Sequence, residues 1–176
     1  MSIDTGTIAE YTHHMKNKAI LFVSILVLLV AAVVVFRSYQ RSYQEKVTVS
    51  ETEQVKSIVI DFGTHLKNVP LTAQKELLVP VIKKEYSPFV SQTLLERFEE
   101  DPAHAPGRQT SSPWPDRLEI QEVQQRGNYY EVVAQVVNMT SVEVKKGGDA
   151  GRDTVYLTVA FIDGVWKIAD YQTSME

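Results

Sequence analysis

The 176-residue sequence contains no cysteine. Disulfide bonds, Cys-ligated zinc, iron–sulfur clusters and thiolate chemistry are therefore excluded. The sequence also lacks a Gly-rich phosphate loop, a nucleophile elbow, a zinc-ligand spacing and a kinase signature. We therefore expect a non-enzymatic protein that binds no cofactor and no metal.

Charge is nearly absent from one long stretch near the N-terminus. Residues 19–36 read AILFVSILVLLVAAVVVF, in which Ser24 is the one polar residue. As a helix, 18 residues span roughly 27 Å, close to the hydrocarbon thickness of a bilayer. The alternatives are a buried core segment and a signal peptide, whose apolar region is shorter and ends in a small-x-small cleavage site. We expect an uncleaved transmembrane helix over 19–36, between a tail (1–18) and a juxtamembrane linker (37–49).

Basic and aromatic residues flank this run on both sides. Tyrosine at the headgroup level and cations that reach lipid phosphates are typical of interfacial anchoring. The expected membrane-interface residues are Lys16, Lys18, Arg37, Tyr39, Arg41 and Tyr43. Cations on both sides leave the orientation open. We expect the short tail to be cytoplasmic and the C-terminal domain extracytoplasmic, with the inverted orientation as the alternative.

The rest of the chain is acidic. Residues 47–176 carry 13 Lys and Arg against 19 Asp and Glu, a formal net charge of −6. Because an acidic surface repels phosphates, we expect no nucleic-acid partner. The length of 50–176 fits one compact domain.

The first half of this domain has helical periodicity. A capping box of Ser50 and Glu53 precedes apolar residues at helical spacing, and Asn68-Val69-Pro70 ends that helix. A second, short helix is predicted over 72–79, ended by Pro80. A third is predicted from Ser87 or Ser91 to Phe98.

The second half has the period of two that is typical of strands. Four prolines between Asp101 and Arg117 predict an irregular stretch. Four strands follow, separated by Gly127-Asn128, by the polar loop 145–153 and by the hairpin signal Asp163-Gly164. Helices first and then an antiparallel meander predict an α+β fold, with three helices packed on one face of a curved four-stranded sheet.

The last strand carries the pattern IDGVWKIADYQ (Ile162 to Gln172). This pattern, after helices and long hairpins, resembles the nuclear-transport-factor-2-like, or cystatin-like (SnoaL-like), cone superfamily over about residues 50–176. The resemblance implies a cone-like domain. Membrane-anchored members include the inner-membrane scaffold proteins of type IV secretion systems, which share this order of tail, span and cone. Uncharacterised envelope proteins of Gram-positive bacteria are similar as well.

Enzymes of that superfamily use Asp, His or Tyr for proton transfer, so the resemblance makes Asp61, His65 and Tyr86 candidates for this role. Asp61 and His65 lie four residues apart and could share a proton or a metal, but an exposed surface pair is the favoured interpretation. His13-His14 lies beside lysines without carboxylate neighbours, so we expect no metal there. Asn138-Met139-Thr140 is a formal glycosylation sequon in a strand-like run.

The segment around residues 108–117 places cations, hydroxyls and an indole in one loop. Its candidate interaction or pocket-mouth residues are Arg108, Trp114, Asp116 and Arg117. In the structural alternative, Trp114 plugs the open end of the cone, while the two arginines pair with acids such as Asp101 and Asp116. Trp166 alternates with Ile168 and is expected in the core.

These features predict a single-pass cell-membrane protein whose domain binds other envelope proteins or itself, in addition to the lipid bilayer. Tyr156, Tyr171 and Val133 are expected on exposed sheet faces. The alternative is a small-molecule binder or enzyme that uses the apolar pocket of the cone.

Overall fold

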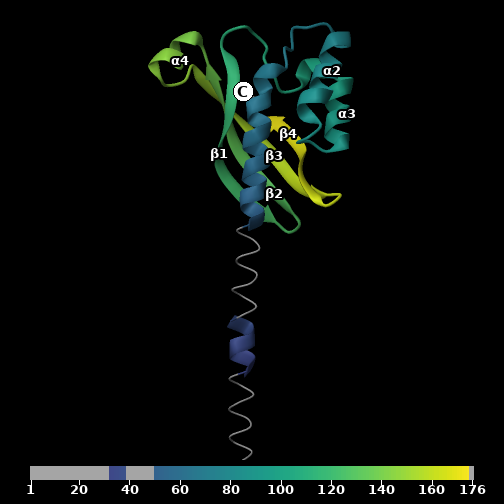
Figure 1. Ribbon diagram of the computed structural model, residues 1–176, viewed down its shortest axis with the longest axis vertical. Helices are drawn as coiled ribbons and strands as arrows, with labels where there is room; N and C mark the ends of the chain where they lie inside the picture. Colours follow the sequence, from purple (N-terminus) through teal and green to yellow (C-terminus); the bar gives the residue numbers. More distant parts are fainter. Residues whose placement is uncertain (1–31, 39–49, 175–176) are drawn as a thin grey trace, which may run out of the picture. The chain divides into compact units, whose positions relative to one another are not determined.

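The computed structural model describes residues 32–38 and 50–174 (Figure 1). The chain divides into two compact units, residues 1–49 and 50–176. Residues 32–38, which include Arg37, are helical. Most of the predicted span 19–36 and the other predicted interface residues (Lys16, Lys18, Tyr39, Arg41 and Tyr43) lie outside the described residues. Within the described ranges, no helix has both the length and the apolar character needed to cross a bilayer.

A four-stranded antiparallel meander forms the sheet of the second unit, in the order β1-β2-β3-β4. Its strands are β1 (Trp114–Arg126), β2 (Tyr129–Met139), β3 (Gly151–Ile162) and β4 (Val165–Thr173). Both predicted tight turns are confirmed. Gly127 has φ +66°, while Asp163 and Gly164 have φ +52° and +85°, the left-handed backbone that two-residue hairpins require.

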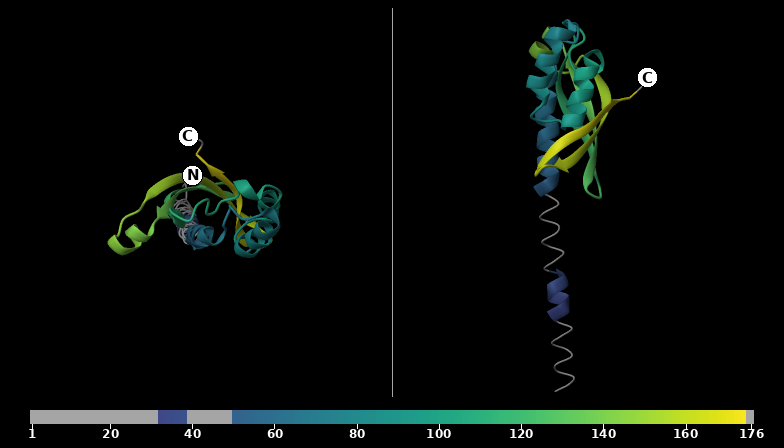
Figure 2. Two further views of the ribbon diagram at one scale, coloured as in Figure 1. Left: turned by 90° about the horizontal axis from the view of Figure 1, so that it is seen from above. Right: turned by 90° about the vertical axis from the view of Figure 1, so that its right-hand side faces the viewer.

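Helices cover one face of this sheet (Figure 2). They are a helix over residues 50–65 that continues into η1 (Leu66–Asn68), then α2 (Lys75–Tyr86), α3 (Gln92–Glu100) and the short η2 (Pro102–His104). The α+β class predicted from the sequence is confirmed. Ser91 caps α3 by accepting a hydrogen bond from the backbone N of Leu94, so the third helix starts at the second of its two predicted sites.

The core lies between the helices and the inner face of the sheet. Val59, Phe62 and Leu66 from the first helix are at most 1% exposed, and so are Tyr130 and Val132 of β2. Gly63 lies where this helix crosses β1. A Cβ atom there would come within 2.5 Å of the backbone N of Leu118, so only glycine allows this close approach.

The predicted end of the second helix at Pro80 is wrong, because α2 continues to Tyr86. Pro80 is exposed. Because proline has no backbone N–H, the helix lacks one hydrogen bond at this position. Leu78, Ile82 and Tyr86 recur every four residues and are at most 2% exposed. Burying each such side chain contributes about 1.5–3 kcal/mol, which together offsets a proline cost of about 3 kcal/mol.

The predicted irregular stretch ends earlier than expected, because β1 begins at Trp114 and includes Pro115. This proline is tolerated because β1 is an edge strand and because its register shifts between Pro115 and Arg117. One further difference concerns the start of the first helix. Ser50 is itself helical, and Glu53 pairs with Lys56 (2.8 Å) instead of completing a capping box.

A fourth helix that the sequence did not predict, α4 (Ser141–Lys146), precedes and overlaps the start of the predicted polar loop 145–153. The capping box that starts it is formed by Thr140 and Glu143. None of its residues is buried. In both orthogonal views α4 projects from the body of the domain at the end of the β2–β3 hairpin (Figures 1 and 2).

Candidate interaction surface

The four candidate residues of the 108–117 segment do not form one site. Arg108 fixes the loop through its backbone: its N donates to the carbonyl of Val69 (2.8 Å) and its carbonyl accepts from the N of Leu71 (2.9 Å). Of the acids expected to pair with the two arginines, Asp116 binds Arg117, whereas the Asp101 carboxylate binds Nδ1 of His104 (2.9 Å).

Trp114 is half-buried at the start of β1, opposite Met139. It is not among the partly buried hydrophobic side chains that pack against the core. The structure therefore does not place Trp114 as a plug of the interior. Trp166 does pack against the core, with its ring 5.2 Å from that of Tyr130, as expected.

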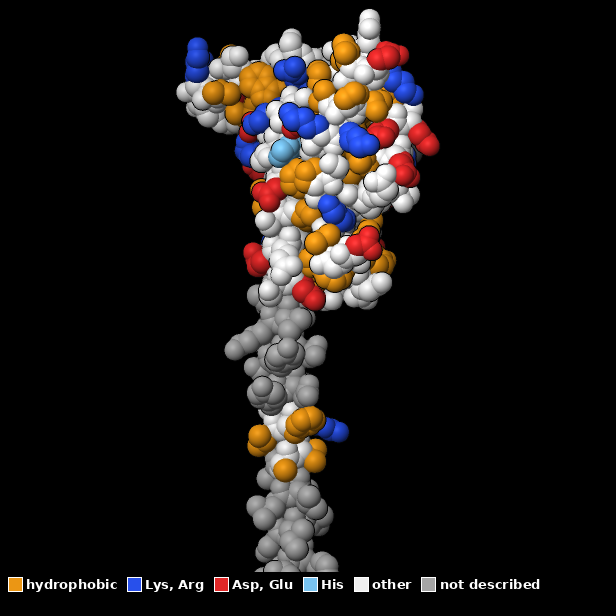
Figure 3. Space-filling model, turned by 45° about the vertical axis from the view of Figure 1, so that its right-hand side comes forward, with side chains coloured by type: hydrophobic (Ala, Val, Ile, Leu, Met, Phe, Trp, Pro, Cys, Tyr) orange, Lys and Arg blue, Asp and Glu red, His pale blue; other side chains and the backbone are white. Residues whose placement is uncertain are grey.

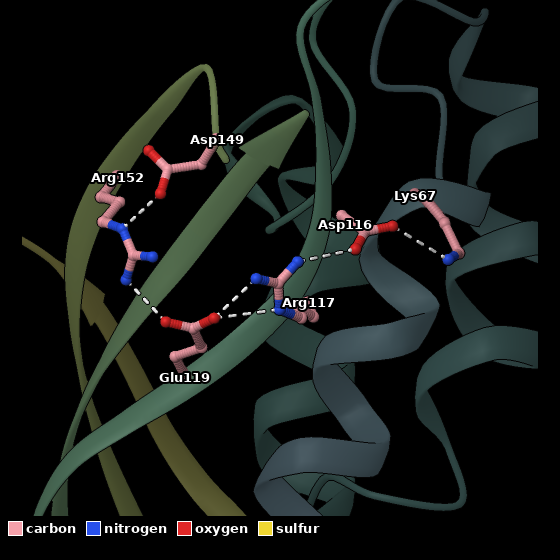
Figure 4. Close-up of polar contacts among 6 residues, drawn as sticks. All are labelled: Lys67, Asp116, Arg117, Glu119, Asp149 and Arg152. Atoms are coloured by element: carbon pink, nitrogen blue, oxygen red, sulfur yellow. Dashed lines mark hydrogen bonds and ion pairs between the residues drawn. The ribbon is translucent and has the colours of Figure 1, made fainter. Parts of the chain in front are cut away.

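Asp116 and Arg117 belong to a charge ladder of six side chains with alternating sign (Figure 4). Arg117 binds Asp116 (Nη1–Oδ2, 3.2 Å) and Glu119 (Nη2–Oε1, 2.6 Å). From Asp116 the ladder extends to Lys67 in η1. From Glu119 it extends across the sheet to Arg152 and then to Asp149. In order, its members are Lys67, Asp116, Arg117, Glu119, Arg152 and Asp149.

Two guanidinium groups converge on one carboxylate in this ladder. Hydrogen bonds from Arg152 and then Arg117 hold the pKa of Glu119 below its usual range. Glu119 also raises the pKa of both arginines. Three cations face three anions, so the ladder is neutral and its charges are satisfied internally. It fixes η1, β1 and β3 relative to one another and does not form a ligand site.

The sheet face opposite the helices carries a hollow that sequence reasoning did not localise. Inward residues of β2 and β3 are buried, so the alternate residues between them point to this outer face. Val133 and Tyr156 are cross-strand partners there, and Tyr156 is 49% exposed. They lie in a hollow of about 420 Å³ that spans all four strands.

The charged side chains that line this hollow are three carboxylates, Glu122, Glu131 and Asp170, and the single guanidinium of Arg126. Arg126 Nε binds Glu131 (2.9 Å). Asp170 Oδ1 accepts from Nη2 of Arg97 in α3 (2.7 Å). The partial burial of Asp170 would raise its pKa, but the hydrogen bond from Arg97 contributes to a net lowering. Glu122 accepts a hydrogen bond from Gln124 and has no ion pair among the described residues. The hollow therefore joins an apolar floor to a rim with an excess of one carboxylate, because Glu131 and Asp170 are paired with arginines and Glu122, within the described chain, is not.

The prediction that Tyr171 lies on an exposed sheet face is wrong. Tyr171 packs against the core, with its ring 6.1 Å from that of Phe62 and 6.5 Å from that of Phe98. Ala169 lies opposite no residue of β3, because the register shifts between Thr158 and Val159. This bulge turns Tyr171 inward.

The three candidates for proton transfer, Asp61, His65 and Tyr86, bind different partners. Asp61 accepts from Ser57 Oγ (3.2 Å), whereas His65 Nδ1 contacts Glu85 Oε2 (2.9 Å). Glu85 is buried and also accepts from Asn68 Nδ2 (2.8 Å). The hydrogen bonds from Asn68 and, next in size, His65 lower the pKa of Glu85 against the effect of its burial.

Tyr86 is fully buried, and its hydroxyl donates to the carbonyl of Pro106. Burial raises the pKa of Tyr86 well above its usual value. Both Tyr86 and Glu85 therefore connect α2 to neighbouring segments. No nucleophile is hydrogen-bonded to His65 in the described part of the chain, and that part holds no group of three metal-ligating side chains.

The arm formed by α4 is the second exposed feature. Val142 and Val144 are 52% and 64% exposed, and Lys145 and Lys146 follow in the last turn. On a helix, residue 142 shares a face with 145 and 146. One face of the arm thus combines an apolar side chain with two cations. The region of α4 is visible at the upper left of Figure 3, where hydrophobic and basic side chains lie together.

Together these features define an α+β domain with an aromatic-rich core, an outer sheet face that no described helix covers and a projecting arm. No protein-family model matches the sequence. No curated protein matches it. Among solved structures, the chain is similar to a chain in the crystal structure of the type VI native effector–immunity complex Tae3–Tai3 from Ralstonia pickettii. The identity is 15%, the match covers 62% of this chain and 98% of that chain, and the TM-score is 0.34. A similarity this distant defines neither family nor function.

Proposed function

We propose that the protein is a single-pass envelope protein, held in the cell membrane by residues 19–36, whose extracytoplasmic domain binds proteins through the outer face of its sheet. The observation that carries the proposal is the hollow around Val133 and Tyr156. It lies on a sheet face that no helix of the described chain covers (Figure 2). Aromatic side chains that are exposed and surrounded by polar groups are typical of protein interfaces.

The packing of aromatic side chains in the core favours a non-enzymatic role. Phe62 and Tyr86 occupy the space between helices and sheet with their rings 5.0 Å apart, and the ring of Phe89 is 6.3 Å from that of Phe62. A small-molecule site in a cone requires an open interior lined by a few polar groups. Nothing in the described core favours that alternative.

The order of elements supports assignment to the cystatin-like cone architecture. Helices precede the meander, the sheet curves around them, and the strand with the Gly-Val-Trp-Lys-Ile pattern closes it. We retain the comparison with membrane-anchored scaffold proteins as part of this proposal. The apolar length of 19–36 supports the membrane location.

A site-specific photocrosslinker tests the proposed function. The full chain is expressed in cells with a photoreactive phenylalanine at Tyr156 or, as the control, at Leu77, which is 65% exposed on α2. Position 156 is expected to crosslink to a protein in the membrane fraction, and position 77 is not. The proposal fails if Tyr156 captures no protein or if both positions capture the same ones.

A further inference from the structure

The α4 arm is mostly exposed to solvent. A helix of six residues is unstable in isolation, because helix nucleation is unfavourable and few backbone bonds form. Helices this short are normally held by burying an apolar face, yet α4 buries no residue. Its two valines remain in solvent, where each exposed apolar side chain forgoes the free energy of burial.

The arm and the hollow are complementary in chemistry. Val142 matches the apolar floor made by Val133 and Tyr156. Lys145 and Lys146 match a rim in which Glu122 forms no ion pair within the described part of the chain. Opposite charges of this kind steer association and fix its register.

The arm and the hollow belong to different parts of the domain. α4 projects beyond one end of the sheet, whereas the hollow lies across the outer face of the strands (Figures 1 and 2). We infer that the α4 arm of one copy of this chain docks into the outer-face hollow of a second copy, with Val142 on the apolar floor and Lys145 and Lys146 on the acidic rim. This inference rests on the proposed function and identifies the bound protein as a second copy of this chain.

Such a contact is heterologous, because it joins two different patches. Each docked copy presents a free arm at one end and a free hollow at the other. Heterologous contacts therefore form open chains, or rings where the rotation closes. Chains held in one membrane meet in the same plane, which raises their effective concentration.

The absence of native cysteine allows a clean crosslinking test. Two differently tagged full-length chains, one with Val142→Cys and one with Thr158→Cys, are co-expressed and oxidised in membranes. Thr158 lines the hollow, and Thr93→Cys on exposed α3 replaces it in the matched control. The inference predicts a disulfide between positions 142 and 158 and none between 142 and 93. A single chain carrying both Val142→Cys and Thr158→Cys is expected to give a series of multimers.

Charge reversal tests the role of the rim. Lys145→Glu with Lys146→Glu on the arm-bearing copy is expected to lower the 142–158 crosslink by about tenfold, the equivalent of about 1.4 kcal/mol. Glu122→Lys on the other copy is expected to restore most of it. Lys83→Glu, at an exposed lysine of α2, is the control for reversal of a surface charge away from the arm and is expected to change little.

The outcomes separate this inference from the proposed function. A crosslink between two copies of position 142, or no copy-to-copy crosslink at all, overturns the arm-in-hollow contact. If position 158 instead bonds to a cysteine of another protein, the inference falls while the proposed function stands. If neither position 158 nor the photocrosslinker at 156 meets any protein, both fall.

Discussion

Replacing Gly63 with alanine tests the packing that aligns the first helix with the sheet. Within a helix, Gly→Ala ordinarily stabilises by about 1 kcal/mol, because alanine restricts the unfolded chain and favours helix. Here the added Cβ would lie 2.5 Å from the backbone N and 2.7 Å from the Cβ of Leu118. A backbone atom of β1 cannot turn away as a side chain can, so the helix and strand must separate.

Overpacking of this kind costs about 1–3 kcal/mol, and the contact with backbone favours the upper end. After subtraction of the helix-propensity gain, we expect Gly63→Ala to lower the free energy of unfolding by about 1–2 kcal/mol. For a domain of this size that corresponds to a melting temperature about 3–8 °C lower. The assay is thermal unfolding of the full chain in detergent, followed by near-UV circular dichroism.

Gln54→Ala on the same helix is the control, because Gln54 is exposed and its substitution is expected to stay within about 0.5 kcal/mol of wild type. An unchanged or raised melting temperature for Gly63→Ala would falsify the close crossing of the first helix over β1.

Two further substitutions test the polar contacts of α2. Because the folded-state pKa of Glu85 is lowered from 4.5, its charge stabilises the fold above about pH 4.5, and this contribution disappears as the pH falls through the folded pKa. Glu85→Gln is thus expected to cost about 1–2 kcal/mol at pH 7 and progressively less below pH 4.5, measured by urea unfolding at several pH values; a pH-independent difference would contradict this. Tyr86→Phe removes the hydroxyl that binds Pro106 and is expected to cost about 1 kcal/mol in the same assay; full stability would show that this bond contributes nothing.

Local signals in the sequence predicted local structure well. Asp163-Gly164 indicates a two-residue hairpin turn with left-handed backbone, and the turn forms there. Ser91 has the side chain that an N-cap needs, and α3 starts after it. Features of this kind depend on a few adjacent residues, so the sequence contains the information directly.

Predictions that depended on tertiary contacts were less reliable. Pro80 is a helix-ending signal, but the core contacts of Ile82 and Tyr86 outweigh it. Tyr171 looked like an outward residue of a regular strand, and a bulge that no sequence pattern indicated turns it inward. α4 was missed because six residues are too few for periodicity to show.

The candidate surface could be predicted only in part. The pairing of Arg117 with Asp116, expected in the structural alternative, forms, but the further partners Glu119, Arg152 and Asp149 come from later residues of the chain. The hollow depends on the register that sets Val133 opposite Tyr156. A signal for it existed in the sequence, since both are apolar residues at outward positions of their strands.

The proposed arrangement has two parts, a domain outside the membrane and an outer sheet face covered by a protein. A single labelling experiment tests both: intact cells carrying full-length Thr158→Cys or Thr93→Cys chains are treated with a membrane-impermeant thiol reagent. We predict that both positions react, and that position 158 reacts several-fold more slowly than position 93 until the protein is diluted in detergent. Two positions that remain unlabelled in intact cells while reacting after lysis would contradict the extracytoplasmic location, and equal rates in membranes and in dilute detergent would contradict the covered outer face.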